Sequence, residues 1–244
     1  MKALLRWLAL VGLALFVLQL FFVGRIAAMA VIDPQSTAFQ RSEAWRVVGD
    51  KGDLRWRQRW VPYAQISDNL KRAVIASEDD GYTDHDGVDW DAVEKAWAKN
   101  SRAEQLAEQR AAASRGRNTR APKVIGGSTI TQQLAKNLFL SGERTLLRKG
   151  QELVLTLMLE AVLDKQRILE IYLNNVEWGE GVFGAQAASE HYFRKPASRL
   201  SAYEAARLAV MLPRPKYFEK LPGSAYLAGR AATITARMPH ARLP

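Results

Sequence analysis

An N-terminal hydrophobic run is the strongest pattern along the chain. Residues 7–23 read WLALVGLALFVLQLFFV, with one glutamine as the only polar side chain. About 17 apolar residues come close to the length that spans a bilayer as a helix, and the run has no polar face, unlike an amphipathic core helix. Lys2 and Arg6 precede it, so the positive-inside rule keeps the N-terminus in the cytoplasm. The pattern predicts a transmembrane anchor at 7–25 after a cytoplasmic segment at 1–6.

A cleaved signal peptide is the alternative for this segment. Ala28, Met29 and Ala30 resemble the small-residue cleavage site of such peptides. The apolar run is long for the hydrophobic region of a signal peptide, so we expect an uncleaved anchor.

Helical periodicity dominates the rest of the chain. The segment 66–77 places its apolar residues on one face, with Ser67 as a plausible N-cap. Ser201 and Glu204 form a capping-box pattern that opens a later helix, which ends before Pro213. The other expected helices are 89–99, 128–140, 146–163 and 166–173. There is no internal repeat and no long alternating pattern, so the sequence predicts a mainly α-helical fold.

Polar and turn-forming residues separate these helices. A proline and the turn signal Gly49–Gly52 predict that 26–60 is a connector with short extended pieces. The segment 101–123 carries six basic and two acidic residues, and its second half has no apolar period, so it predicts a mobile loop. The domain is therefore expected at 61–220, followed by a C-terminal tail at 221–244.

Composition and charge narrow the function classes. The 244 residues contain no cysteine, which excludes disulfides, thiolate nucleophiles and cysteine-ligated zinc. Lysine and arginine number 35 against 25 acidic residues, a formal net charge of +10. This charge indicates an anionic partner, and nucleic acid, anionic lipid and a phosphorylated substrate all fit it.

The acidic segment 77–87 is the first group of residues that could carry chemistry. It follows an apolar-faced helix and contains five carboxylates and one histidine. A carboxylate near other acids and buried apolar surface has a raised proton affinity, which suits a general base. A metal site and a solvated surface loop are the alternatives, although the segment lacks the glutamate spacing of a calcium loop.

The glycine pair Gly126–Gly127 introduces the second group. Ser128 is a plausible N-cap after it, and a helix N-terminus offers N–H groups to an oxyanion. Ser128, Gln132 and Lys136 recur every four residues and would share one polar stripe. The pattern favours phosphate binding, and an ordinary capped amphipathic helix is the alternative.

A basic pair close to a glutamate forms the third group. Arg148 and Glu152 are four residues apart in an expected helix, with Lys149 beside them. An ion pair at this spacing contributes only a few tenths of a kcal/mol. Gly150 in the helix interior costs about 1 kcal/mol relative to alanine. That cost indicates close packing or a ligand.

These groups, taken in order, resemble the motifs of glycosyltransferase family 51, the peptidoglycan glycosyltransferases. The matching residues lie between about 66 and 217 and are Glu78, Asp79, Tyr82, His85 and Gly87; Gly126–Gln133 with Lys136 and Asn137; Arg148, Lys149 and Glu152; Ile168–Asn174 with Trp178; and the segment from His191 to Pro213. Tyr82 stands where the family usually has phenylalanine. The basic segment 101–123 is longer and more polar than the mobile, membrane-proximal region of the family.

The resemblance implies a fold and a reaction. The fold would be a lysozyme-like helical glycosyltransferase domain with a smaller membrane-proximal jaw subdomain, held by the transmembrane helix. The reaction would polymerise lipid II, an undecaprenyl-pyrophosphate-linked disaccharide pentapeptide, into β-1,4-linked glycan strands. The growing lipid-linked chain would be the donor and lipid II the acceptor, with inversion at the donor anomeric carbon and release of undecaprenyl pyrophosphate.

The resemblance also assigns roles to individual residues. Glu78 would be the general base, and Glu152, the second catalytic residue, would orient nearby cations or hold a divalent cation, Mg²⁺ or Mn²⁺. The substrate-binding residues would be Asp79, His85, Ser128, Gln132, Gln133, Lys136, Asn137, Arg148 and Lys149. The supporting residues would be Tyr82, Gly127, Tyr172 and Asn174.

The same resemblance implies the partners and the location of the protein. Lipid II, the growing lipid-linked glycan and membrane lipids would be bound, transpeptidases and other cell wall synthesis proteins would be partners, and nucleic acid would not. No S-x-x-K or K-T-G motif occurs, so we expect a monofunctional enzyme without transpeptidase activity. It would be a single-pass protein of the bacterial inner membrane with its catalytic domain in the periplasm.

Two other functions are alternatives. One is a lysozyme-like hydrolase or lytic transglycosylase, which would have no use for the basic residues around Lys136 and Arg148. The other is a membrane-tethered scaffold with a degenerate site, although every charged motif residue is present.

Overall fold

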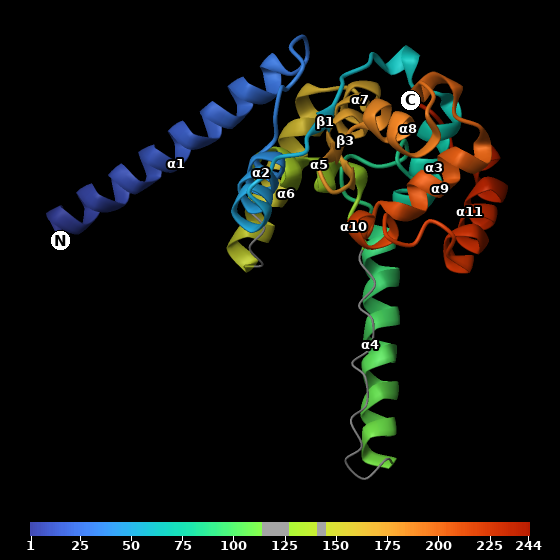
Figure 1. The fold of residues 1–244 in the computed structure, drawn as a ribbon. Helices are drawn as coiled ribbons and strands as arrows, with labels where there is room; N and C mark the ends of the chain where they lie inside the picture. Colours follow the sequence, from blue (N-terminus) through green and yellow to red (C-terminus); the bar gives the residue numbers. More distant parts are fainter. Residues whose placement is uncertain (114–126, 141–144) are drawn as a thin grey trace.

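The computed structural model of the protein describes residues 1–113, 127–140 and 145–244, and these residues are mainly α-helical, as the sequence predicts (Figure 1). Gly126 and the part of 101–123 that we expected to be a loop lie outside the described residues.

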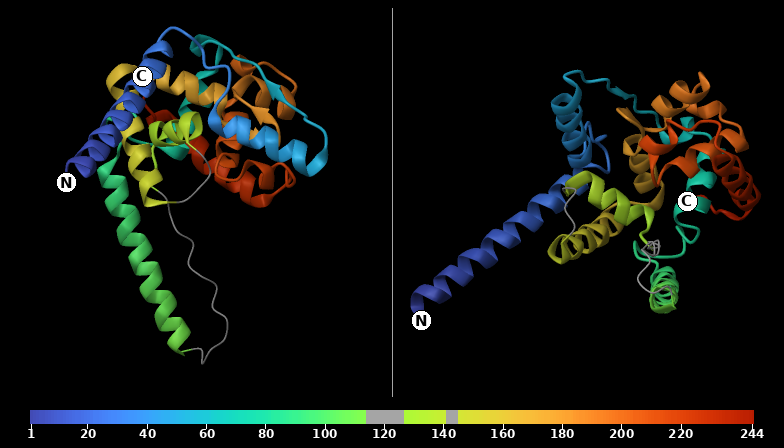
Figure 2. Two further views of the ribbon diagram at one scale, coloured as in Figure 1. Left: turned by 90° about the vertical axis from the view of Figure 1, so that its left-hand side faces the viewer. Right: turned by 60° about the horizontal axis from the view of Figure 1, so that its bottom comes forward.

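Helix α1 (Lys2–Ala28) matches the expected anchor. It is long and apolar enough to cross a membrane, and most of its side chains are exposed. Figures 1 and 2 show it projecting from the body of the protein. Its last turns contact that body, because Ile26 is fully buried in the core and the rings of Phe22 and Phe139 meet edge to face at 5.4 Å. Anchor and body are therefore in direct contact.

The residues around the alternative cleavage site are part of this contact. Ile26 and Met29 are 0% and 4% exposed within the core. Arg167 Nε donates a hydrogen bond to the Met29 carbonyl at 2.7 Å. Cleavage after Ala30 would remove these core residues, so the packing favours an uncleaved anchor.

Helix α2 (Ala38–Lys51) occupies the middle of the segment that we expected to be a connector with extended pieces, and that expectation is wrong for this helix. Thr37 and Gln40 form a capping box at its start, and Gly52 ends it with a φ of 68°. Only Gln40 and Val47 are buried, so the helix has no apolar stripe that a periodicity argument could detect. Its caps define it instead.

Helix α3 (Asp68–Glu78) lies in the core and packs against α9 (Ala202–Met211). Both begin as the sequence predicts. Ser67 is the N-cap of α3, and Ser201 forms a capping box with Glu204 at the start of α9. The helix that ends at the candidate base is therefore capped at one end and buried along one face.

The segment 221–244, which we expected to be a tail, contributes to the core. Helix α11 (Ala225–Arg237) packs against α9 and α3, and it buries Leu227 and Ile234. The short turn η3 (Met238–His240) continues along α3. The helical body therefore extends beyond residue 220.

Three helices follow one another through the middle of the chain, as predicted. They are α5 (Ile130–Phe139), α6 (Leu146–Val162) and α7 (Lys165–Asn175), and α6 and α7 both pack against α5. Later in the chain come α8 (Ala185–Phe193) and α10 (Pro215–Phe218), and α10 contacts the small sheet.

The sheet consists of β1 (Arg57–Gln58), β3 (Val182–Phe183) and β2 (Glu177–Gly179) in that order, with β1 parallel and β2 antiparallel to β3. These strands are too short to give an alternating pattern in the sequence. The turns η1 (Tyr63–Gln65) and η2 (Ala197–Arg199) complete the described elements.

Helix α4 (Trp90–Ala113) extends well beyond the helix expected at 89–99 and includes the first half of the basic segment. It projects from the body in Figure 1 and in the left view of Figure 2. Asp89 caps its first turn by accepting a hydrogen bond from the Ala92 N–H at 2.8 Å. Trp90 and Trp97 are exposed on its surface.

Candidate active site

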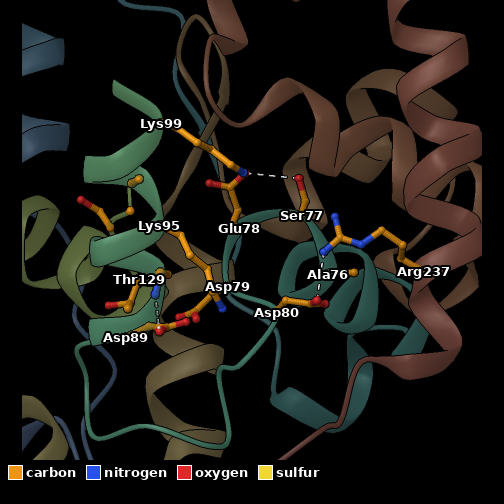
Figure 3. Close-up of a pocket in the computed structure, with 14 residues that line it drawn as sticks. Ala76, Ser77, Glu78, Asp79, Asp80, Asp89, Lys95, Lys99, Thr129 and Arg237 are labelled. Carbon is orange, nitrogen blue, oxygen red and sulfur yellow. Dashed lines mark hydrogen bonds and ion pairs between the residues drawn. The ribbon is translucent and has the colours of Figure 1, made fainter. Parts of the chain in front are cut away.

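Glu78 is the last residue of α3 and lies half-buried in a cleft (Figure 3). Its carboxylate accepts hydrogen bonds from Ser77 Oγ at 3.3 Å and from Gln133 Nε2 at 3.1 Å. Burial raises the pKa of Glu78 above its ordinary value, and these hydrogen bonds together with the charge of Lys136 offset part of that effect. A carboxylate with a raised pKa in a cleft is suited to accept a proton.

Tyr172 fixes the orientation of Gln133. It is buried on α7, and its hydroxyl donates to Gln133 Oε1 at 3.0 Å. Because the amide oxygen is engaged in this way, the amide nitrogen points to Glu78. We expected Gln133 to bind substrate and Tyr172 to support the site, and the structure places both in one chain of hydrogen bonds that ends on Glu78.

Asp79 and His85 hold the loop after α3 against the start of α5. Asp79 Oδ2 accepts a hydrogen bond from the Ile130 N–H at 2.9 Å, and Oδ1 lies 2.8 Å from His85 Nε2. The Gly87 N–H donates to His85 Nδ1 at 3.1 Å, so the neutral imidazole carries its proton on Nε2 and donates it to Asp79. Both side chains are at least nine-tenths buried, so they position the loop that follows Glu78.

Gly87 marks the closest approach of this loop to α6. Its φ is +89°, and an added Cβ would lie 2.8 Å from side-chain atoms of both Glu160 and Thr156. Its carbonyl accepts a hydrogen bond from Thr129 Oγ1 at 2.6 Å. Only glycine fits this position without displacing α6.

Tyr82 is fully buried beneath the loop, where it keeps the packing expected of an aromatic residue. Its ring meets His85 edge-on at 6.4 Å between centroids, and its hydroxyl donates to the Lys165 carbonyl at 2.8 Å. The hydroxyl that distinguishes this chain from the usual phenylalanine therefore has a partner.

The N-cap of α5 lies one residue later than predicted. Thr129 is the N-cap and forms a capping box with Gln132, so the prediction of Ser128 as the N-cap is wrong. The stripe of Ser128, Gln132 and Lys136 does not form, because Ser128 precedes the helix and Gln132 is buried in the cap. Lys136 is exposed on α5, and Asn137 beside it is half-buried. The capping box satisfies N–H groups of the first turn that an oxyanion would otherwise contact.

The third group is built around a buried carboxylate on α6. Glu152 is 3% exposed and forms ion pairs with Arg148 at 2.8 Å and with Lys149 at 2.5 Å. This predicted pair is thus more than a surface contact, because removing the cations would leave a buried charge without compensation. An added Cβ on Gly150 would meet nothing within 4 Å, so close packing, one of the two explanations expected for this glycine, is wrong, and the ligand stays a prediction.

The same ion pairs bear on the divalent cation expected at Glu152. Each of its carboxylate oxygens already contacts a basic side chain. The residues that the structure describes contain no group of three His, Cys, Asp or Glu side chains that could hold a metal ion. The described donors therefore do not fit a cation held at Glu152.

Asn174 and Gly127 have the supporting positions expected of them. The Asn174 amide is buried and exchanges hydrogen bonds with both backbone groups of Val61, at 2.9 Å and 3.0 Å. An added Cβ on Gly127 would lie 3.2 Å from the Ala92 carbonyl, so this glycine lets the start of α5 approach α4.

The cleft beside Glu78 has a volume of about 270 Å³ and is lined in part by basic residues outside the predicted site. Lys95 and Lys99 line it from α4, and Arg237 lines it from α11, where it pairs with Asp80 at 3.0 Å (Figure 3). The spacing of Lys95 and Lys99 places them on one helix face, a signal that was present in the sequence. Arg237 gave no signal, since it lies far from Glu78 along the chain.

Known proteins resemble this chain over almost its entire length. A family model described as Transglycosylase matches residues 47–239. Proteins named biosynthetic peptidoglycan transglycosylase from Burkholderia thailandensis, Burkholderia pseudomallei and Paraburkholderia phytofirmans are 55%, 54% and 50% identical over 98% of this chain. The matches cover 88%, 88% and 94% of those proteins. The chain therefore belongs to the transglycosylase family.

Proposed function

We propose that this chain polymerises lipid II into β-1,4-linked glycan strands for cell wall synthesis. The observation that carries the proposal is Glu78, a carboxylate with a raised pKa in a cleft that also holds basic side chains. The family membership and the names of the relatives support the same reaction class.

In the proposed reaction Glu78 acts as the general base. A sugar hydroxyl is a weak nucleophile, so proton transfer to the carboxylate accelerates its attack. The acceptor oxygen bonds to the donor anomeric carbon, the bond from that carbon to the pyrophosphate oxygen breaks, and the proton moves to Glu78. Attack opposite the leaving group inverts the anomeric carbon.

The leaving pyrophosphate needs charge stabilisation and no strong acid. Lys136, Arg148 and Lys149 are the basic side chains that we assign to it. Glu152 holds the last two in place through its ion pairs. A requirement for Mg²⁺ or Mn²⁺ stays a prediction, and turnover measured before and after chelation tests it.

The remaining proposals concern location and partners. We infer that α1 anchors the chain in the inner membrane with the body in the periplasm, since Lys2 and Arg6 precede the apolar run. The absence of the S-x-x-K and K-T-G motifs supports an enzyme without transpeptidase activity. Peptide cross-linking would then come from transpeptidases and other cell wall synthesis proteins acting as partners.

The experiment that tests the proposal is turnover of labelled lipid II by the purified full-length protein. Formation of glycan polymer with release of undecaprenyl pyrophosphate supports it. Degradation of purified sacculi without consumption of lipid II would instead identify the hydrolase. The variant Glu78→Gln serves as the inactive control in both assays.

A further inference from the structure

The wall of the cleft formed by α4 carries two basic side chains with no partner among the described residues. Lys95 and Lys99 both line the cleft (Figure 3), and neither forms a hydrogen bond or ion pair within the part of the chain that the structure describes. Like charges four residues apart destabilise a helix. An anionic group placed between the two ammonium groups would relieve this repulsion.

The acidic side chains of the same cleft already have partners. Glu78 accepts hydrogen bonds from Ser77 and Gln133, and Asp79 is bound to His85 and the backbone of α5. Two further acids also line the cleft: Asp80 pairs with Arg237, and Asp89 caps α4. Each carboxylate of the cleft therefore has a hydrogen-bond or ion-pair partner among the described residues, whereas the two lysines have none, and the group that complements two adjacent ammonium groups is an anion.

The position of the two lysines is set by the way α4 is attached. Asp89 caps the first turn, and the Ala92 carbonyl lies against Gly127 at the start of α5. On a helix with 3.6 residues per turn, Lys95 and Lys99 then lie on the side opposite the exposed Trp90 and Trp97. Rotating α4 to move the lysines out of the cleft would break both attachments.

We propose that Lys95 and Lys99 bind an anionic group of the acceptor lipid II, so that its sugar hydroxyl is held next to Glu78. This inference rests on the proposed function. The anion is either the pyrophosphate of the acceptor or a carboxylate of its stem peptide.

The stereochemistry assigns these lysines to the acceptor. In an inverting displacement the attacking and leaving oxygens lie on opposite sides of the anomeric carbon. A cation in the cleft of the general base therefore lies on the attacking side. The basic residues assigned to the leaving group, Lys136, Arg148 and Lys149, do not line this cleft.

The test compares variants of the full-length protein in two assays, equilibrium binding of lipid II and its polymerisation. The double variant Lys95→Ala with Lys99→Ala should bind lipid II at least about tenfold more weakly and raise KM by a similar factor, with a smaller change in kcat. The variant Lys95→Arg with Lys99→Arg should restore most of the affinity. The matched control is Arg102→Ala with Arg110→Ala, which removes the same charge from α4 outside the cleft and should change both quantities less than about twofold.

Three outcomes separate the claims. Unchanged binding in the double variant overturns the inference, and so does an equal loss in the control, which would indicate a general effect of charge. If the parent protein binds lipid II but forms no polymer, the proposed function is contradicted. The binding assay on the variants then still decides whether Lys95 and Lys99 hold lipid II. Binding of lipid II that lacks its stem peptide identifies the anion. If the double variant still binds this ligand more weakly than the parent protein does, the lysines contact the pyrophosphate. If the two proteins bind it equally well, the lysines contact a peptide carboxylate.

Discussion

Gln133 donates a hydrogen bond from Nε2 to the carboxylate of Glu78 across 3.1 Å, and it does so in an orientation that a third residue imposes. The buried hydroxyl of Tyr172 donates to the other end of the same amide. The amide nitrogen is therefore fixed as a donor to Glu78. The position of the candidate base thus depends on α7 and α5 as well as on α3.

Replacing Glu78 by glutamine removes the proposed base and keeps the size of the side chain. We expect polymerisation to fall by about 10²–10⁴-fold, the usual contribution of general base catalysis. The activity of the parent protein should also fall at acid pH, with a midpoint above the ordinary carboxyl pKa of 4.5, because burial favours the protonated form. Initial rates between pH 4 and pH 9 measure both effects. Chain growth near the parental rate by the variant would contradict the assignment.

The variants Tyr172→Phe and Tyr82→Phe form a matched pair. Each removes one buried hydroxyl that donates a hydrogen bond, to Gln133 and to Lys165 respectively. Each should lower the free energy of unfolding by about 1 kcal/mol. Only Tyr172→Phe should also lower kcat and shift the acid limb of the pH profile, because only this hydroxyl orients the donor to Glu78. Thermal denaturation and pH–rate profiles test the pair, and identical kinetics in the two variants would argue against the relay.

Lys136→Ala should weaken binding of the donor more than binding of the acceptor. Loss of a charged hydrogen-bond donor to pyrophosphate lowers affinity by roughly 10–100-fold. The measurement is separate titration of a lipid-linked glycan donor and of lipid II in steady-state assays. Equal losses for the two substrates would be inconsistent with a role at the leaving pyrophosphate.

The contributions of Glu177 and Glu180 to the stability of the fold should change with pH in opposite directions. Burial raises the pKa of Glu177 to about 7, although Lys216 lies 3.4 Å away. The folded state therefore holds its proton more tightly than the unfolded state, and stability is lost as the pH rises from about 4.5 through about 7. Glu177→Gln should therefore raise the free energy of unfolding above that of the parent protein by up to about 3 kcal/mol at pH 8 and change it little at pH 4.

The control for this prediction is Glu180→Gln. A hydrogen bond from Lys51 lowers the pKa of Glu180, so its contribution to stability is present above the unfolded value of 4.5 and is lost as the pH falls. This variant should be less stable than the parent protein at pH 8 and similar to it at pH 3. Melting temperatures across this range decide the matter, and parallel shifts in the two variants would refute the sign argument.

Local patterns predicted those parts of the fold whose signals are local. Apolar spacing and caps located α3 and α9, since Ser67 and Ser201 bind N–H groups a few residues away. The helix α2 was missed because its buried residues are few, although the capping box of Thr37 and Gln40 was visible in the sequence. Adjacent Ser128 and Thr129 both suit an N-cap, and only the glutamine three residues after Thr129 distinguishes them.

The candidate site was predicted less completely, because parts of it arise from tertiary contacts. The group around Glu152 is local and was visible as a pair four residues apart. The hydrogen bond between Gln133 and Glu78 and the arrival of Arg237 beside Asp80 join distant segments. No spacing rule reports such contacts, since they depend on how the helices pack.

The burial of Ile26 at the base of α1 has a mechanical consequence. In the proposed membrane-anchored protein, a flexible tether would let the body tilt and drift above the bilayer, whereas a helix whose end is packed into the body would hold Glu78 at a fixed height above the lipid headgroups. Because a helix rises 1.5 Å per residue, the number of residues of α1 that precede Phe22 would set that height. Substrates whose sugars lie at a constant distance from the membrane would then reach the carboxylate without movement of the body along the membrane normal.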